Sequence, residues 1–292
     1  MERPTISDHI FLITGASSGL GRATARRALA AGHTVVGTVR TESAAEEFAA
    51  LVPGRSHARI LDVARFEDAR RVVEDFERTV GPIDVLVAAA GYGHEGTVEE
   101  STIDEWRRQF DVNVFGAVAV IQAVLPGMRA RRAGHIITIT SVGGLVAAPT
   151  LGVYNGSKFA LEGITRALAA EVASLGIRVT AVEPGAFRTA WSGRSMHRAT
   201  RTVSDYDDLV GPISAARAGF DGRQPGDPDR AAEVLVRLIE LPEPPTQLLL
   251  GPDAHRTVTG ALAAYAAQIE KWRALTLSTD FDAEPAASDV SD

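Results

Sequence analysis

The chain of 292 residues contains no cysteine. This absence excludes disulfide bonds, thiolate nucleophiles and cysteine-ligated zinc, and it fits the reducing cytoplasm, which is the location we expect. The seven histidines are scattered along the chain without the spacing of metal ligands, so the sequence predicts no catalytic metal. Residues 1–9 are polar and the first apolar run covers only residues 10–13, which predicts no signal peptide.

The chain as a whole carries no excess of basic charge. The net charge is −7, and residues 280–292 hold five acidic residues and no basic one, so the remainder carries only −2. We therefore expect neither a nucleic-acid nor a membrane partner, and we expect the acidic tail to be disordered. Residues 135–157 lack every Lys, Arg, Asp and Glu, but they include four glycines, a proline and many hydroxyls. We interpret this stretch as a buried wall of an active site.

Short apolar segments alternate with helix-like segments along most of the chain, and the first strand is apolar throughout, as in a strand that is buried on both faces. The expected strands are residues 9–14, 33–39, 57–61, 83–87, 135–140, 176–182 and 246–250. The expected helices are residues 22–31, 43–51, 66–80, 102–128, 158–175, 228–240 and 253–274. This alternation predicts an α/β fold with a doubly wound parallel sheet of about seven strands. One domain covers residues 1–279, with a lid at about 186–227 after the sixth strand.

A glycine-rich turn joins the first strand to the first helix. Its sequence is Gly15-Ala-Ser-Ser-Gly19-Leu-Gly21. At such a turn backbone N–H groups converge, the helix dipole favours negative charge, and glycine lets a pyrophosphate approach the backbone. The turn therefore predicts a dinucleotide site at the carboxyl end of the sheet.

Tyr154 and Lys158 are four residues apart in a segment that becomes helical, so their side chains emerge on one face. A nearby ammonium favours the phenolate and lowers the pKa of a tyrosine, which makes the phenol an acid/base group. Ser141 ends the apolar run before this segment and is placed to offer a second hydroxyl to the same substrate oxygen. The spacing predicts a proton-transfer site.

The long helix after residue 101 opens with a capping box at Thr102 and Glu105. Its apolar residues recur every three or four positions and predict one continuous buried stripe. The stripe consists of Ile103, Trp106, Phe110, Val114, Val118, Ile121, Leu125 and Met128. Asn113 interrupts it, and by itself an amide at this position indicates an exposed or internally satisfied side chain more than a functional one.

Together these motifs resemble the short-chain dehydrogenase/reductase family, in its smaller single-domain branch with a Rossmann-type fold. The matching motifs run in order over residues 9 to about 251: Thr14-Gly15-x-x-x-Gly19-x-Gly21, Asp62, Asn113, Ser141, Tyr154-x-x-x-Lys158 and Pro184-Gly185-x-x-x-Thr189. The resemblance implies an oxidoreductase that transfers hydride between a nicotinamide cofactor and a carbonyl or alcohol. It also implies a homodimer or homotetramer.

The resemblance also assigns site residues. Tyr154 is implied as the acid/base, Lys158 as the group that lowers its pKa and binds the nicotinamide ribose, and Ser141 as the holder of the carbonyl. Asn113 is implied as the anchor of a water in the proton relay. The implied cofactor-binding residues are Gly15, Ser17, Ser18, Gly19, Leu20, Arg40, Thr41, Asp62, Val63, Ala89, Gly91, Tyr154, Lys158, Pro184, Gly185, Phe187 and Thr189. The implied substrate-binding residues are Ser141, Gly143, Tyr154, Phe187 and Trp191.

The chain departs from the family at one place. The fourth strand ends in Ala88-Ala89-Ala90-Gly91, where the family usually has Asn-Asn-Ala-Gly. Two side-chain amides are lost, which puts in doubt the hydrogen bonds that tie this strand to its neighbours and help to seat the cofactor. We expect weaker cofactor binding or lower stability, and intact chemistry.

The end of the second strand indicates the cofactor. NAD-preferring relatives carry an acidic residue there that binds the ribose 2′-hydroxyl. This chain has Arg40 and Thr41, with no acid before Glu42. A guanidinium binds phosphate oxygens in a bidentate fork. We therefore predict that NADP(H) is preferred over NAD(H), and that carbonyl reduction is the cellular direction.

The expected lid is rich in large apolar residues without helical or strand spacing: Phe187, Trp191, Met196, Tyr206, Leu209 and Phe220. They predict a mobile cover over a bulky, apolar alcohol or ketone of a lipid-like, steroid-like or aromatic class. Two alternatives remain open at this point. One is a non-catalytic dinucleotide-binding regulator, and the other is an epimerase or dehydratase of nucleotide-sugars, whose glycine spacing and larger C-terminal domain this chain lacks.

Overall fold

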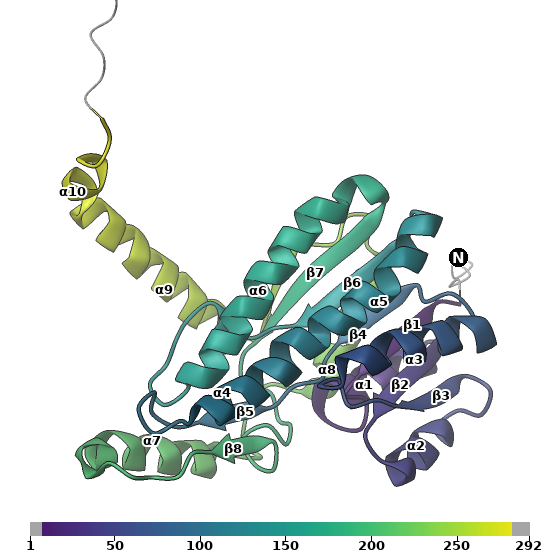
Figure 1. Ribbon diagram of the computed structural model, residues 1–292, viewed down its shortest axis with the longest axis horizontal. Coiled ribbons are helices and arrows are strands. Elements are labelled where there is room, and N and C mark those ends of the chain that lie inside the picture. The colour runs from purple at the N-terminus through teal and green to yellow at the C-terminus, as the bar shows by residue number, and fades with distance from the viewer. Residues whose placement is uncertain (1–7, 282–292) are drawn as a thin grey trace, which may run out of the picture.

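The computed structural model describes residues 8–281, so the predicted acidic tail from residue 282 onward lies outside the described residues. Its centre is a seven-stranded parallel sheet, which confirms the predicted fold class (Figure 1). In spatial order the strands are β3 (Ser56–Ile60), β2 (Thr34–Val39), β1 (Ile10–Thr14), β4 (Val85–Ala88), β6 (Gly134–Ile139), β7 (Ile177–Pro184) and β9 (Gln247–Leu250). The strand order reverses between β1 and β4, which is where ligands bind in doubly wound sheets.

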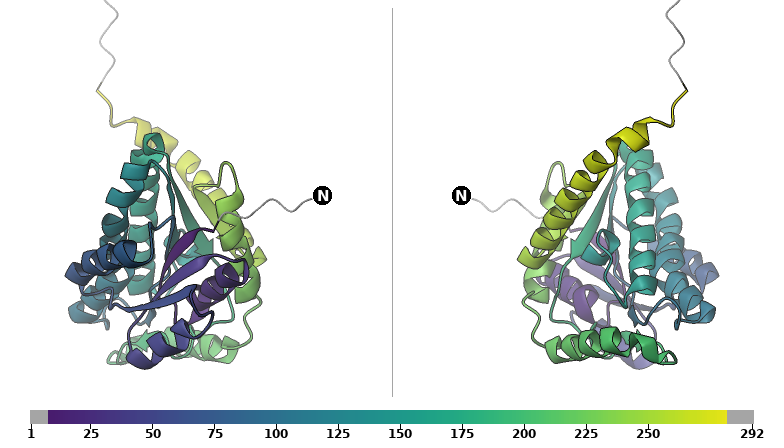
Figure 2. Two further views of the ribbon diagram at one scale, coloured as in Figure 1. Left: turned by 90° about the vertical axis from the view of Figure 1, so that its right-hand side faces the viewer. Right: turned by 90° about the vertical axis from the view of Figure 1, so that its left-hand side faces the viewer.

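Helices cover both faces of the sheet (Figure 2). They are α1 (Gly19–Ala30), α2 (Glu42–Ala49), α3 (Phe66–Thr79), α4 (Ile103–Phe110), α5 (Gly116–Arg131), α6 (Gly152–Val172), α7 (Asp207–Phe220), α8 (Pro228–Arg237), α9 (Pro252–Lys271) and α10 (Arg273–Leu277). Apolar residues of α1 and α8 pack on one face, and those of α3, α5 and α6 pack on the other. Strand residues alternate between these two cores because successive side chains point to opposite faces.

The helix that carries the catalytic motif begins earlier than the sequence predicts. The expected start is Lys158, but α6 begins at Gly152 and so includes both Tyr154 and Lys158. The preceding residue Leu151 bridges in parallel to Gly96, which holds the start of the helix against the end of β5 (Gly93–Glu95). The two catalytic side chains therefore lie one turn apart on a regular helix, as their spacing requires.

The buried stripe predicted for the long helix is wrong in its first half. Ile103 is 63% exposed, whereas the polar Glu105 and Gln109 are buried. A π-helical turn at Asp111–Phe115 joins α4 to α5. The extra residue in this turn shifts the helical register, so Val120 and Val124 join the predicted Ile121 and Met128 in the core, and the predicted Leu125 is only partly buried against it. The same turn buries Asn113 completely.

The lid is more regular than the sequence predicts. It contains a short strand, β8 (Met196–Arg198), which pairs in parallel with β5 (Gly93–Glu95), and it contains the 14-residue helix α7. Leu209 and Phe220 therefore do lie on a helix, contrary to the irregular spacing expected for them. Figure 1 shows this segment, drawn in green, at one end of the molecule beside α4 and β5.

Two features lie apart from the central layers. Helix α9 extends away from the body and leads into α10 at its tip (Figure 1). The continuous helical stretch Ile103–Arg131 is long and apolar enough to cross a membrane by length and composition alone. This is weak support for a span, because its residues Val120, Ile121 and Met128 pack into the core beside the sheet.

Candidate active site

A cavity of about 820 Å³ lies at the carboxyl ends of the central strands. The predicted residues that line it are Gly15, Ser17, Ser18, Gly19, Leu20, Arg40, Asp62, Val63, Ala89, Gly91, Ser141, Tyr154, Lys158, Pro184, Gly185, Phe187, Thr189 and Trp191. Three predicted residues do not line it, namely Thr41, Asn113 and Gly143. The fold thus brings together groups from segments as distant as residues 15 and 189.

The glycine-rich turn has the shape that a pyrophosphate needs. Gly15 and Gly19 both adopt positive φ, at 67° and 55°. A Cβ at Gly21 would lie 2.6 Å from the carbonyl oxygen of Gly15, so only glycine allows the turn to close this tightly. The first turn of α1 has no acidic residue and its N-cap Ser18 makes no side-chain cap, which leaves N–H groups available to an anion.

Ser141, Tyr154 and Lys158 converge beneath this turn. Tyr154 and Lys158 are both 6% exposed. The Lys158 Nζ donates to the carbonyl oxygen of Ile139 at 2.8 Å and lies 5.9 Å from the centre of the Tyr154 ring. The Ser141 hydroxyl accepts from the Gly143 backbone N–H at 2.9 Å, which fixes its rotamer beside Tyr154. Gly143 therefore acts on the site through Ser141.

Burial dominates the pKa values of the catalytic pair. It raises the pKa of Tyr154 to about 12, and a hydrogen bond with Ser141 opposes this rise. It lowers the pKa of Lys158 to about 8. The direction for Tyr154 is opposite to the lowering predicted from the spacing, because loss of water around the phenolate is the largest cause of the shift. At neutral pH both groups of this protein carry their protons.

Asn113 has a different set of contacts from the one that the resemblance implies. Its Oδ1 accepts from the Tyr92 backbone N–H at 3.1 Å, and its Nδ2 donates at 3.1 Å both to the Tyr92 carbonyl and to the Ser157 hydroxyl. These bonds pin the loop after β4 to α6. Asn113 thus holds the two walls of the cavity together, and its implied role in a water relay stays a prediction.

The end of β4 is hydrogen-bonded to β1, although alanines stand where the family usually has asparagines. The Thr14 hydroxyl accepts from the backbone N–H groups of both Ala89 and Ala90 at 3.0 Å. This pair of bonds joins the end of β4 to the end of β1 without a side-chain amide. The weaker cofactor binding or lower stability expected from the alanines stays a prediction.

Arg40 is exposed, lines the cavity and forms no ion pair or hydrogen bond among residues 8–281. Its guanidinium is free to bind an anion at the end of β2. Thr41 has another task, since its hydroxyl oxygen caps α2 by accepting from the Ala44 N–H at 3.3 Å. Asp62 and Val63 lie at the end of the neighbouring β3, on the side of the cavity where an adenosine would be bound.

The lid contributes apolar and polar walls. Trp191 stacks at an angle on Tyr154, with ring centroids 5.0 Å apart, and Phe187, Met196 and Phe220 also line the cavity. Tyr206 and Leu209 do not, although the sequence suggested them. Polar lid residues that sequence reasoning missed are Ser192, Arg194, His197, Arg217 and Gln224. The spacing of Arg217 and Phe220 on α7 would have indicated a shared face, had this helix been recognised.

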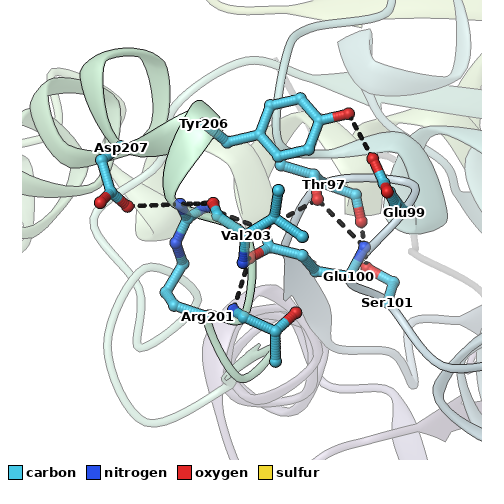
Figure 3. A network of polar contacts seen from close by, with 9 residues as sticks. Thr97, Glu99, Glu100, Ser101, Arg201, Val203, Tyr206 and Asp207 are labelled. Atoms are coloured by element: carbon cyan, nitrogen blue, oxygen red, sulfur yellow. Dashed lines mark hydrogen bonds and ion pairs between the residues drawn. The ribbon is translucent and has the colours of Figure 1, made fainter.

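Polar contacts fasten the lid to the loop before α4 (Figure 3). The buried Glu100 carboxylate accepts from the backbone N–H groups of Thr202 and Val203 at 2.7 and 3.0 Å, and pairs with Arg201 at 2.8 Å. These N–H groups, with Thr97 and Arg201, hold the pKa of Glu100 below its ordinary value. Nearby, Tyr206 donates to Glu99 at 2.7 Å. The lid is therefore anchored at its base.

Glu100→Gln is expected to loosen this anchor. The new amide N–H group would face the existing donors, so at least one bond to the lid would be lost. We expect cleavage by trypsin within residues 194–217 to speed up roughly tenfold and KM to rise while kcat changes little. Glu99→Gln, which leaves the backbone contacts of Glu100 intact, serves as the control. Equal cleavage rates in both variants would show that the Glu100 contacts do not hold the lid.

The chain is similar to known proteins in both sequence and fold. The family profile described as "short chain dehydrogenase" matches residues 9–199. The chain is 37% identical to "Oxidoreductase BOA17" of Botryotinia fuckeliana over 92% of this chain and 98% of that protein. It is 36% identical to "3-ketodihydrosphingosine reductase" of Bacteroides thetaiotaomicron over 83% of this chain and 88% of that protein.

Two further comparisons bear on the site. The "NADPH-dependent 3-dehydrocapnine reductase" of Ornithobacterium rhinotracheale is 33% identical over 70% of this chain and 75% of that protein. A solved short-chain dehydrogenase from Streptomyces avermitilis superposes with a TM-score of 0.88 and 38% identity, covering 94% of this chain and 100% of that one. Both the sequence and the fold of the chain are thus similar to those of oxidoreductases over most of its length.

Proposed function

This chain belongs to the short-chain dehydrogenase/reductase family, and we propose that it is an NADP(H)-dependent oxidoreductase interconverting a bulky, largely apolar ketone or aldehyde and its alcohol. As a member of this family it is an NAD(P)-dependent dehydrogenase or reductase. One observation carries the proposed reaction. Ser141, Tyr154 and Lys158 line the same cavity as the glycine-rich turn, so proton-transfer groups and a dinucleotide site share one space.

The cavity fits a bound nicotinamide dinucleotide, because Gly15 and Gly19 adopt positive φ and Gly21 packs closely on Gly15, which lets the turn present its N–H groups to a pyrophosphate. When bound, the nicotinamide supplies or takes the hydride. Gly15, Ser17, Ser18, Gly19 and Leu20 would hold its pyrophosphate. Pro184, Gly185, Phe187 and Thr189 would hold the nicotinamide end, and Asp62 and Val63 the adenine end.

The protein's own task is to place a proton on the substrate oxygen. Ser141 and Tyr154 present two hydroxyls to that oxygen, and burial beneath Trp191 excludes water from it. With a pKa raised to about 12, Tyr154 is a protonated donor at neutral pH. An alkoxide is more basic than a phenolate, so the proton moves toward the substrate as the carbonyl is reduced.

Lys158 stabilises the phenolate that remains on Tyr154. Its ammonium is retained at neutral pH, since its pKa is about 8, and the Ile139 carbonyl fixes its position. The charge of Lys158 favours the phenolate after transfer, when a negative charge exists to be attracted. Carbonyl reduction as the cellular direction rests on the proposed preference for NADP(H).

The preference for NADP(H) is supported by Arg40, whose guanidinium has no partner among the described residues and borders the cavity. It gains support from the relative named as NADPH-dependent. The proposed substrate class is supported by the apolar wall of Phe187, Trp191, Met196 and Phe220, and by the relative named 3-ketodihydrosphingosine reductase. The polar lid residues Arg217 and Gln224 favour a substrate that is polar at one end.

The function is tested with a panel of carbonyls and alcohols, assayed by nicotinamide absorbance with both cofactors. Bulky apolar ketones, including long-chain ketones with a polar end, are expected to give a kcat/KM at least tenfold above that of small polyols and sugars. A better kcat/KM for small polyols would overturn the substrate class. No activity with any compound of the panel would favour a non-catalytic dinucleotide-binding regulator. Conversion of a substrate without net change in the redox state of the cofactor would favour an epimerase.

We also propose that the protein acts as a homodimer or homotetramer, with α9 in the contact. This helix and the Trp272 that follows it expose four large side chains at intervals of three or four residues: Leu262, Tyr265, Ile269 and Trp272, each at least 50% exposed. A contiguous apolar stripe on a helix that leaves its own body suits a second copy of the same helix. The cytoplasmic location stays a prediction.

Ile269→Glu is expected to lower the molar mass in solution to that of a single chain, because it places a charge in the middle of the stripe. Mass is measured by light scattering after size exclusion. Gln268→Glu, at the neighbouring exposed position, adds the same charge and is expected to keep the wild-type mass. An Ile269→Glu variant with unchanged mass would place the contact elsewhere or show a monomer.

A further inference from the structure

Three residues that are far apart in the sequence meet at the base of the lid. His94 lies on β5, Glu105 in the first turn of α4, and His197 on β8. Each offers one ligand-type atom, and these atoms all lie within 4.8 Å of one another. His197 also lines the cavity described above. The cluster therefore borders the active site without belonging to the catalytic group.

The buried polar ring of His94 is not accounted for by the hydrogen bonds of the fold. It is fully buried, and neither of its ring nitrogens has a hydrogen-bond partner in the described part of the chain. Its Nε2 lies 3.9 Å from Glu105 Oε2, which is beyond hydrogen-bond distance. Buried polar atoms without a partner are rare, and each one suggests something that the protein chain does not supply. An ion seated between the ring and the carboxylate would satisfy it.

The backbone positions the imidazole rings of His94 and His197 next to each other. His94 and His197 are directly paired in the parallel register of β5 and β8, and their ring centroids are 5.3 Å apart. Glu105 is fixed by the capping box, because its Oε2 accepts from the Thr102 backbone N–H at 2.7 Å. Its other oxygen, Oε1, faces His197 Nε2 at 2.7 Å. All three side chains are thus positioned by regular structure.

We propose that His94, Glu105 and His197 bind a divalent transition-metal ion, with zinc as the best match. Two imidazoles and one carboxylate form a donor set that zinc takes. Zinc bonds of about 2.0–2.2 Å in a tetrahedron place the ligand atoms roughly 3.3 Å apart. Glu105 Oε1 lies 2.7 Å from His197 Nε2 and Glu105 Oε2 lies 3.9 Å from His94 Nε2, so rotations of these side chains would bring one oxygen and both ring nitrogens to this spacing.

Such an ion would replace the hydrogen bond between His197 and Glu105 with two stronger bonds. The fourth ligand would be a water or a substrate oxygen, since His197 opens onto the cavity. The ion would join β8, where the lid begins, to α4 and β5 of the body. It is a positioning site for the lid, and it does not depend on the proposed substrate or cofactor.

The test uses the untagged full chain, dialysed against a chelator and then titrated with zinc alone. We expect one equivalent to bind tightly and the midpoint of thermal unfolding to rise by roughly 5 °C at a hundredfold excess over Kd. Cobalt added in place of zinc is expected to show the visible absorption bands of a tetrahedral site. Binding below one equivalent, or no shift in the unfolding midpoint, would overturn the proposal.

His197→Gln is the main variant, because His197 is partly exposed and its loss leaves the core packing in place. We expect at least tenfold weaker zinc binding and loss of the cobalt bands. His255→Gln, at an exposed histidine on α9, is the matched control and is expected to bind zinc like the wild type. Should His197→Gln fail to fold, Glu105→Gln keeps the capping box and removes a charged ligand. Zinc binding that is equal in the ligand variant and the control would refute the site.

Discussion

Tyr154→Phe is expected to lower turnover by roughly 10²-fold or more while cofactor affinity hardly moves. The phenyl ring fills the same buried space and keeps its contact with Trp191, so the fold and the cavity are retained. What is lost is the proton that the hydroxyl gives to the substrate oxygen. The effect should therefore fall on kcat, measured with saturating cofactor, and not on the dissociation constant of the cofactor, measured by fluorescence.

The matched control for this change is Tyr265→Phe, which removes the same hydroxyl from a residue that is 62% exposed on α9. It is expected to leave kcat unchanged. Near wild-type turnover in Tyr154→Phe would remove Tyr154 from its role as proton donor and would leave Ser141 as the remaining hydroxyl at the carbonyl.

Arg40→Ala is expected to weaken the binding of NADPH by about 1.5 to 3 kcal/mol and to change NADH binding little. This is roughly a 10- to 150-fold loss in affinity. The physical reason is the loss of a charge-assisted pair between the guanidinium and the 2′-phosphate, which NADH does not have. Arg40 borders the cavity and has no competing partner among residues 8–281, so the N–H groups of its guanidinium are free to bind the phosphate.

Affinities for both cofactors are compared by titration in the wild type and in two variants. Arg70→Ala removes an exposed arginine on α3 that pairs with Glu74, and is expected to change neither affinity. Equal efficiency of the wild type with NADH and NADPH would overturn the proposed preference. An equal loss of affinity for NADH and NADPH in Arg40→Ala would show that Arg40 contacts a part of the cofactor that both molecules have.

The central layers and the core of the site could be predicted from the sequence because their signals are local. The seven strands of the sheet are short apolar runs, and each was expected within about two residues of its observed ends. The glycine-rich turn and the Tyr-x-x-x-Lys spacing are also local, since a turn and one helical repeat place their atoms without help from the rest of the chain. Of the 21 site residues, most of which the family resemblance implied, 18 line the cavity.

Other features depend on packing between distant segments. The π-helical turn buries Asn113 because Tyr92 and Ser157 offer it partners, and no periodicity in the helix itself shows them. The burial that raises the pKa of Tyr154 comes from surrounding elements. The prediction from the Tyr-x-x-x-Lys spacing took only the charge of Lys158 into account. The lid helix α7 was missed because its stability comes in part from ion pairs such as Arg217 with Glu95.

The parallel α/β sheet, the nucleotide turn and the catalytic pair follow from the order of residues alone, because hydrophobic period, glycine conformation and helical repeat act over a few residues. Only the tertiary structure decided which side chains from different segments share a space. His94 and His197 are separated by about a hundred residues and show no ligand spacing, yet parallel pairing of β5 and β8 sets them side by side. Contacts of this kind follow from strand register and packing, which no local pattern of residues specifies.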